Sequence, residues 1–267
     1  MRYAEFAPPP ALSAFVRCVW TLTADAPPSD AVAEPVVPDG CAEVVLNVGD
    51  PFARVGADGA GTAQPLAMVV GQITAPLLLR PTGRTRLLGI RLQPWGGPAL
   101  LGTDMAELRD RQVDAEAVLP ALAELRDRLA GLPDAAWSEV AFAFLAARLR
   151  RDDDAPLARA AALRIAAGRG GDRVDAVAAD LGVTRRTVER VMRDRVGMSP
   201  RDFRRIVRVQ EAIRRLRSTP APVLGRVGLE AGYFDHAHFC REFRRLTSVT
   251  PSEFLARGRA LTEAFLE

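Results

Sequence analysis

Residues 173–200 of the 267-residue chain read RVDAVAADLGVTRRTVERVMRDRVGMSP and contain the strongest local structural signal in the sequence. Gly182 is suited to a tight turn, and Thr184 is a good N-cap for a helix that starts directly after it. The apolar residues before the turn repeat at the spacing of one helix face: Val174, Val177, Ala178 and Leu181. The stretch therefore predicts a helix-turn-helix unit.

The second helix of this unit has an apolar face and a charged face. The apolar residues fall at positions i, i+3 and i+4 and are expected to point inward: Val188, Val191 and Met192. The opposite face carries Arg186, Glu189, Arg190 and Arg193. A charged face on an isolated helix is usually only a solvated surface. Its place on the second helix of this motif favours DNA contact instead, because that helix enters the major groove.

The same pattern occurs again in residues 222–255, PVLGRVGLEAGYFDHAHFCREFRRLTSVTPSEFL. A helix, a turn at Gly232 and a second helix with Asp235 as its N-cap are expected. The inward stripe of that second helix is Phe239, Phe243 and Leu246. A long amphipathic helix that opens at Ser199 and Pro200 separates the two units. The second half of the chain is therefore predicted to be an all-α module of two helix-turn-helix units joined by a long helix.

The two histidines of the chain, His236 and His238, both lie in the second unit. At positions i and i+2 of a helix they point about 200° apart, so they cannot chelate one ion as an i, i+4 pair can. No nucleophile and orienting acid accompany them, which argues against catalysis. Instead, the start of this helix presents His236, Ala237, His238 and Arg241 toward DNA. For His238, a packing or capping role is as well supported as DNA contact.

In these motifs the chain resembles the DNA-binding module of the AraC/XylS family of bacterial transcription regulators over roughly residues 160–258. The resemblance implies that the family's DNA-binding positions fall on Arg186, Glu189, Arg190, Arg193, His236, Ala237, His238 and Arg241. Ser248 stands where the family usually has Gly, and Met192 where Phe is usual. Gly225 and Gly228 lie in a helix that is normally richer in Ala, which would loosen the second unit.

The side chains at these positions also predict which bases are read. Arg190 and its neighbour Arg186 can bind guanine O6 and N7 as a fork, and Glu189 can accept a hydrogen bond from cytosine N4. The first recognition helix therefore suits G·C-containing sequence. Ala237 offers only apolar contact, for instance to a thymine methyl group, so the second helix is expected to rely more on phosphate contacts and DNA shape.

The first half of the chain reads as short strands followed by helices. Five runs of strand length are separated by Gly, Pro and Asp: SAFVRCVWTLTA, CAEVVLNVG, LAMVVGQIT, PLLLRP and TRLLGIRLQP. From about Pro94 the apolar spacing becomes helical, as in LPALAELRDRLAGL and PDAAWSEVAFAFLAARLRR. We expect a small β-barrel (cupin-like) or sandwich with trailing helices. The stretch is similar to a poorly characterised domain that often precedes AraC-type modules.

The acidic stretch RRDDDAP, residues 150–156, is the best linker. We therefore expect an α+β protein of two domains. The first is a sensing or dimerisation domain of residues 1–151, β-rich to about residue 105 and helical over 105–151. The second is a DNA-binding domain of residues 152–267. The two helices near the end of the first domain carry apolar stripes, which can pack on that domain or on a second copy of the chain. Trp20 and Trp95 are more readily explained as core residues than as pocket walls.

Composition excludes several classes of function. All 36 basic residues are arginine, which removes Schiff-base and Walker-type lysine chemistry. The first 235 residues contain no histidine, so no Ser-His pair or multi-histidine metal site can form there. Three cysteines, Cys18, Cys41 and Cys240, have no zinc-ligand spacing. We expect a chain that is not an enzyme and has no catalytic residues, cofactor or metal.

Charge distribution supports a polyanionic partner. Residues 1–159 carry 15 Arg against 20 acidic residues, a net charge of −5, whereas residues 160–267 carry 21 against 13, a net charge of +8. No signal peptide or membrane span is apparent, so a cytoplasmic location is expected.

The sequence thus predicts a sequence-specific DNA-binding transcription regulator that responds to an effector through its N-terminal domain. The partner is double-stranded DNA, with RNA polymerase, a small-molecule effector of unknown identity and a second copy of the chain as further candidates. The operator, the target genes and the choice between activator and repressor are not determined by the sequence. The alternatives are a DNA-binding alkylation-response repair protein, which would need a four-cysteine cluster, and a non-specific architectural DNA-binding protein.

Overall fold

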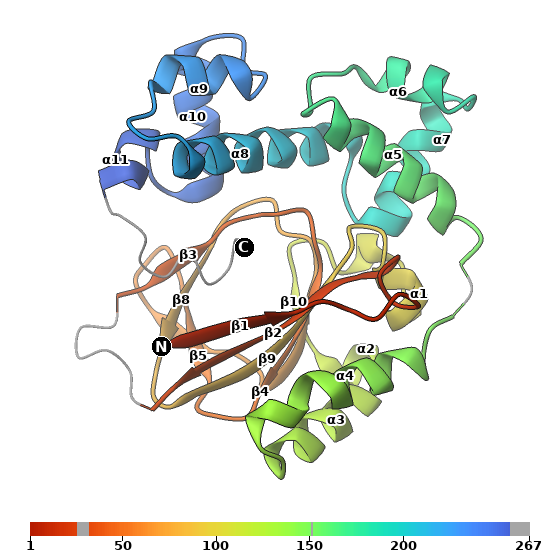
Figure 1. Ribbon diagram of the computed structural model, residues 1–267, viewed down its shortest axis with the longest axis vertical. Coiled ribbons are helices and arrows are strands. Elements are labelled where there is room, and N and C mark those ends of the chain that lie inside the picture. Colours follow the sequence, from red (N-terminus) through yellow and green to blue (C-terminus); the bar gives the residue numbers. More distant parts are fainter. Residues whose placement is uncertain (26–31, 151, 257–267) are drawn as a thin grey trace.

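The computed structural model describes residues 1–25, 32–150 and 152–256 and shows a sheet-rich N-terminal part beneath a helical C-terminal part (Figure 1). In these ranges the N-terminal part contains two antiparallel sheets. The larger sheet has the strand order β1 (Arg2–Phe6), β2 (Val16–Ala24), β9 (Thr85–Leu92), β4 (Glu43–Asn47), β7 (Ala67–Val70) and β10 (Gln112–Asp114). The smaller sheet has the order β3 (Glu34–Val36), β8 (Leu77–Pro81), β5 (Phe52–Val55) and β6 (Gly61–Ala63).

The two sheets are not closed into a barrel. Of the two architectures that the sequence allowed, the structure therefore has the one with two separate sheets. Each of the five apolar runs contains a strand, namely β2, β4, β7, β8 and β9. The strands β1, β3, β5, β6 and β10 were not predicted. Four of these five are edge strands, and edge strands need less apolar sequence because they are paired on one side only.

The centre of the larger sheet is buried on both faces, which explains its nearly continuous apolar sequence. On β9, Leu88, Ile90 and Leu92 belong to a core shared with the helices, whereas Leu87 belongs to a second core that faces the smaller sheet. Gly89 lies opposite Trp20 of β2, and a Cβ atom at Gly89 would overlap the indole ring. The glycine therefore lets the large Trp20 ring lie flat against the neighbouring strand.

Short helices follow the strands and cover one face of the larger sheet (Figure 1). They are α1 (Gly97–Leu101), η1 (Met105–Glu107), α2 (Ala115–Val118), α3 (Ala121–Ala130), η2 (Asp134–Ala136) and α4 (Trp137–Ala146). The apolar stripes of α3 and α4 are buried in the core of the same chain, including Leu125, Leu129 and Trp137. Of the two uses that the sequence left open for these stripes, packing against the same domain is the one observed.

The C-terminal part is helical, as expected. Its helices are α5 (Ala155–Ala167), α6 (Val174–Asp180), α7 (Arg185–Val191), η3 (Met192–Val196), α8 (Pro200–Ser218), α9 (Leu224–Glu230), α10 (His236–Thr247) and α11 (Pro251–Ala256). One apolar core forms around α5, α6 and α7, and a second around α9 and α10. The helix α8 contributes to both cores and so holds the two units at its opposite ends (Figure 1).

The two parts share packing contacts, so the boundary between residues 151 and 152 stays a prediction. Trp95 belongs to the core of the first helical unit, and Val37 belongs to the core of the second. Arg109 bonds Asp202 at 2.9 Å across the same interface. Residue 151, at the expected boundary, and residues 257–267, at the end of the second expected domain, lie outside the described residues.

Among the described residues, no helix combines the length and the apolar character needed to cross a membrane. Cys18 and Cys41 are buried free thiols, and burial raises the pKa of Cys18 to about 12. That thiol is therefore protonated and unreactive at neutral pH. The described ranges contain no group of three or more His, Cys, Asp or Glu side chains placed to hold a metal ion.

Candidate nucleic-acid interface

The first helix-turn-helix unit is built as its local sequence indicates. Gly182 has a φ of +64°, in the left-handed region, and so permits the sharp turn between α6 and α7. The backbone N–H of Thr187 donates to the hydroxyl of Thr184 at 3.2 Å, which caps α7. The inward residues of α7 and the turn of helix after it are fully buried: Val188, Val191 and Met192. The orientation of α7 is thereby fixed by the core beneath it.

All four residues that the sequence singled out are exposed: Arg186, Glu189 and Arg190 lie on the outward face of α7, and Arg193 follows in η3. Glu189 accepts a hydrogen bond from Nε of Arg185 at 2.8 Å. Arg193 donates to Asp194 at 2.9 Å. These pairs link near neighbours on a solvated surface, so they are weak and easily exchanged for contacts to a ligand.

Arg190 has a partner from a different element. Its guanidinium bonds the carboxylate of Asp154, just before α5, at 3.1 Å. The hydrogen bond to Asp154 raises the pKa of Arg190, and the hydrogen bond from Arg190 lowers the pKa of Asp154. Asp154 therefore holds, in this structure, one of the arginines that the sequence assigned to base reading.

The second unit has the same construction. Gly232 has a φ of +85° at the turn, and the backbone N–H of His238 donates to the Asp235 carboxylate at 2.7 Å, which caps α10. Phe239 and Phe243 are fully buried and meet edge to face. Gly228 of α9 packs against the ring of Phe239 with no room to spare for a Cβ atom. Gly228 therefore serves close helix packing, whereas a Cβ atom at Gly225 would meet nothing within 4 Å, so the expected loosening of the unit stays a prediction.

The exposed start of α10 carries His236, Ala237 and Arg241. His238 is different, because 38% of its side chain is exposed and its Nε2 lies 3.2 Å from Oε2 of Glu242. Its ring also meets Tyr233 edge to face at 5.4 Å. The structure thus gives His238 the packing role that the sequence had left open, while its contact with DNA stays a prediction.

Glu242 is the centre of a buried charge cluster that supports this arrangement. Its side chain is 5% exposed and bonds Arg208 of α8 at 3.0 Å, with Arg205 at 3.6 Å. Two arginines from the connecting helix thereby fasten α10 to α8. Such a pair on a buried carboxylate fixes orientation, because moving the helix would leave the charge uncompensated.

Two residues of this surface were not predicted. Phe234, directly before the N-cap of α10, is 89% exposed, and Leu229 of α9 is 63% exposed. The signal for Phe234 was present, since an aromatic residue between Tyr233 and the Asp235 cap falls outside the apolar stripe of either helix. Asp154 was recognised only as part of an acidic linker, and its contact with Arg190 joins residues 36 positions apart, which no local pattern reveals.

The two exposed helices α7 and α10 lie at opposite ends of α8 (Figure 1). A single rigid helix thus separates two surfaces that each carry arginine at a helix able to enter a major groove. Together the fold and these surfaces define a double helix-turn-helix module, a class of domain that binds DNA.

Comparison with known proteins agrees with this class. A helix-turn-helix domain profile matches residues 177–257, and the domain of unknown function DUF6597 matches residues 4–114. An uncharacterized HTH-type transcriptional regulator of Haemophilus influenzae is 37% identical over 65 residues, which cover 24% of this chain and 22% of that protein. The HTH-type transcriptional regulator MtrA of Neisseria gonorrhoeae is 31% identical over 85 residues, which cover 32% of this chain and 28% of that protein. The matches thus span about a quarter of the length of these relatives.

The two-part architecture has a solved counterpart. The crystal structure of ToxT from Vibrio cholerae O395 superposes with a TM-score of 0.51 at 11% identity, over 91% of this chain and 99% of that one. At this identity the likeness concerns the fold alone. The C-terminal part of the chain therefore contains a helix-turn-helix domain over residues 177–257, as the motifs indicated. Both named relatives are described as HTH-type transcriptional regulators.

Proposed function

We propose that this protein is a sequence-specific DNA-binding transcription regulator whose two recognition helices read separate segments of one site. The observation that carries the proposal is that α7 and α10 are each anchored by a buried core, present exposed basic faces and are held apart by α8. A merely solvated charged face would not need this fixed spacing. The net charge of +8 over residues 160–267 supports binding to a polyanion.

We assign direct base reading chiefly to α7. Arg186 and Arg190 suit guanine, and Glu189 suits cytosine. Arg193 lies in η3, just after the end of α7, and suits a phosphate. On α10, His236, Ala237 and Arg241 form the exposed contact surface, with Phe234 as an added apolar contact. His238 acts mainly by orienting the start of the helix, because it is bonded to Glu242.

We further propose that an effector acts through the N-terminal domain. Support comes from the contacts that join this domain to the first helix-turn-helix unit. Arg195 of η3 bonds Asp104 at 2.9 Å and lies 3.3 Å from Asp152, so a shift near η1 would reach the end of α7. Among proteins of similar fold, ToxT of Vibrio cholerae strain SCE256 has been solved with an unsaturated fatty acid bound (TM-score 0.50, 12% identity).

RNA polymerase and a second copy of the chain stay predicted partners. The apolar stripes of α3 and α4 pack largely within the chain, with Val140, Phe142 and Phe144 only partly buried, and dimerisation stays a prediction. The repair-protein alternative is disfavoured, because Cys18 and Cys41 are the only cysteines before residue 240. The architectural alternative differs from regulation in predicting DNA binding without a preferred site, which can be measured.

The test is selection of bound sites from random duplexes by the full-length protein, followed by mobility-shift titration against competitor DNA. The proposal expects an enriched site bound at least about 100-fold more tightly than competitor, and a strong loss of affinity with added salt. Arg241→Ala should weaken binding to the selected site, whereas Arg128→Ala on the distant helix α3 is the matched control. Binding without site preference would support the architectural alternative and overturn this proposal.

A further inference from the structure

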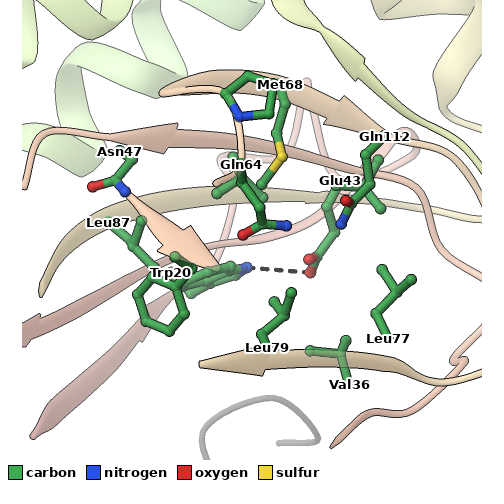
Figure 2. A pocket seen from close by; sticks show the side chains of 14 residues that line it. Trp20, Val36, Glu43, Asn47, Gln64, Met68, Leu77, Leu79, Leu87 and Gln112 are labelled. Atoms are coloured by element: carbon green, nitrogen blue, oxygen red, sulfur yellow. Dashed lines mark hydrogen bonds between the residues drawn. The ribbon is translucent and has the colours of Figure 1, made fainter. Parts of the chain in front are cut away.

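A cavity lies between the two sheets of the N-terminal domain (Figure 2). Its apolar walls come from both sheets, with Trp20, Met68 and Leu87 on the larger sheet and Phe52 and Leu79 on the smaller one. Trp20 is therefore a pocket residue as well as a core residue. The space that the centre of a water molecule can reach is about 50 Å³. That is several times the about 10–15 Å³ needed for one water, which leaves room for a small organic molecule.

Two glutamine side chains in this cavity have hydrogen-bond donors without an acceptor. Nε2 of Gln64 and Nε2 of Gln112 are both buried and unpartnered, and Gln64 as a whole is only 8% exposed. By contrast, the amide of Asn47 in the same wall bonds the backbone at both ends, at 2.8 and 2.9 Å. Buried amide donors are nearly always satisfied in folded proteins. Figure 2 shows both glutamine amides pointing into the space beside the Glu43 carboxylate.

The charge around the cavity is unfavourable for an anion. Glu43 is the charged residue among those that line it, and its carboxylate accepts from Trp20 at 3.2 Å and from Arg91 at 2.7 Å. Arg91 is shared among several carboxylates, because it also lies 3.4 Å from Asp39 and 3.8 Å from Glu5. Three carboxylates thus surround this buried guanidinium, so it is not available to bind a further negative group.

We propose that this cavity binds a small, uncharged, mainly apolar molecule with a carbonyl or similar oxygen that accepts hydrogen bonds from Gln64 and Gln112. The apolar walls hold the body of the molecule, and the two amides fix its oxygen beside Glu43. Carboxylate ligands are excluded by the charge of Glu43. The inference deepens the proposed function, on which its consequence for DNA binding rests, whereas ligand binding itself can be measured without DNA.

The experiment uses two ketones and hydrocarbon isosteres in which a methylene group replaces the oxygen. The pairs are acetophenone with α-methylstyrene, and cyclohexanone with methylenecyclohexane, with benzoate as the anionic probe. Affinities for the full-length protein are measured by ligand-observed NMR titration. At least one ketone should bind about 10-fold more tightly than its isostere, because only the ketone satisfies the amide donors. Benzoate should bind at least about 10-fold more weakly than acetophenone.

The variants Gln64→Leu and Gln112→Leu test the role of the amides. In at least one of them the preference for the ketone should fall to within about 2-fold, with the hydrocarbon binding as well as or better than before. The matched control Gln93→Leu makes the same chemical change outside the cavity and should keep the preference. The wild-type comparison decides the proposal even if a variant fails to fold.

Three outcomes would overturn the inference. The protein binds neither ketone more tightly than its isostere, both leucine variants keep the preference for the ketone, or benzoate binds as tightly as acetophenone. The proposed function is judged separately by DNA site selection without probe. A protein that binds ketones but shows no DNA preference would leave the cavity assignment standing and remove the proposed function. A protein that binds a specific DNA site but fails the ketone test would support the proposed function and overturn the cavity assignment.

Discussion

At the scale of single residues, Ser248 stands out because its φ of +66° places it in the left-handed region at the end of α10. Its backbone N–H bonds the carbonyl of Arg244 at 2.9 Å, so the helix end depends on this conformation. A residue with a Cβ atom adopts it at a cost that glycine avoids. This backbone conformation explains why glycine would suit the position better than Ser248.

Ser248→Gly should stabilise the protein by about 0.5–1 kcal/mol, because it removes the strain while keeping the hydrogen bond. The midpoint temperature of thermal unfolding should rise by roughly 1–4 °C. Ser248→Ala is the control, since it removes the hydroxyl but keeps the Cβ atom, and it should not stabilise. An equal gain for both variants would show that the hydroxyl, and not the backbone conformation, is responsible.

Arg190 of α7 and Arg193 of η3 are both exposed and lie three residues apart, and we expect them to differ in what they contact on DNA. Arg190→Ala should cost about 1–3 kcal/mol of binding free energy at one base position and relax specificity there. Arg193→Ala should weaken all sequences alike, as loss of a phosphate contact does. Specificity profiles of the two variants on single-base substitutions of the selected site provide the measurement. Uniform weakening by Arg190→Ala would mean that Arg190 binds phosphate.

At the scale of elements, the contact between Asp154, directly before α5, and helix α7 is expected to oppose DNA binding. Asp154 bonds Arg190 at 3.1 Å, and the proposed base contact of Arg190 would require DNA to displace this carboxylate. Because the pair is exposed to solvent, it contributes little to stability. The pair is therefore expected to weaken DNA binding only modestly and not to prevent it.

Asp154→Asn should tighten binding to the selected site by about 2- to 5-fold, because it frees Arg190 and removes a negative charge near the phosphates. Asp127→Asn is the matched control, since it makes the same charge change on the exposed end of α3, where Asp127 pairs with Arg126. Fluorescence anisotropy with labelled duplex at low salt measures both. If the two variants tighten binding equally, net charge is responsible and the Asp154 contact has no specific effect.

At the scale of the whole molecule, ion pairs and apolar contacts join the N-terminal domain to the helical module. Arg195 bonds Asp104, and Arg109 bonds Asp202, each at 2.9 Å. In the described part of the connection between α4 and α5, residues 147–150 and 152–154 form no regular helix. The accessibility of that connection reports how firmly the two parts are held together.

The double variant Arg195→Ala and Arg109→Ala should loosen this interface, and trypsin should then cleave after Arg148 or Arg150 about 3- to 10-fold faster than in the wild type. Arg86→Ala is the control, since its partner Asp134 lies within the same domain. Rates follow from gel analysis with mass identification of the fragments. Unchanged cleavage would indicate that the apolar contacts of Trp95 hold the interface without these ion pairs.

The sequence by itself determined the elements whose signals lie close together in the chain. The two helix-turn-helix units are marked by N-caps, glycine turns and apolar stripes within about 30 residues, since these act through neighbouring backbone groups and one helix face. Thr184, Asp235 and Gly182 therefore have the roles that their local sequence predicts. The apolar runs of β2 and β9 were likewise recognisable, because central strands need continuous apolar sequence.

Only the tertiary structure decided what depends on segments far apart. The edge strands, the hold of Asp154 on Arg190 and the close packing of Gly228 on Phe239 all require partners that local patterns do not specify. The same is true of the cavity, where Gln64 and Gln112 come together from different segments of the chain. Periodicity shows which face of an element is buried, but the identity of the neighbour on that face follows from how the sheets and helices pack.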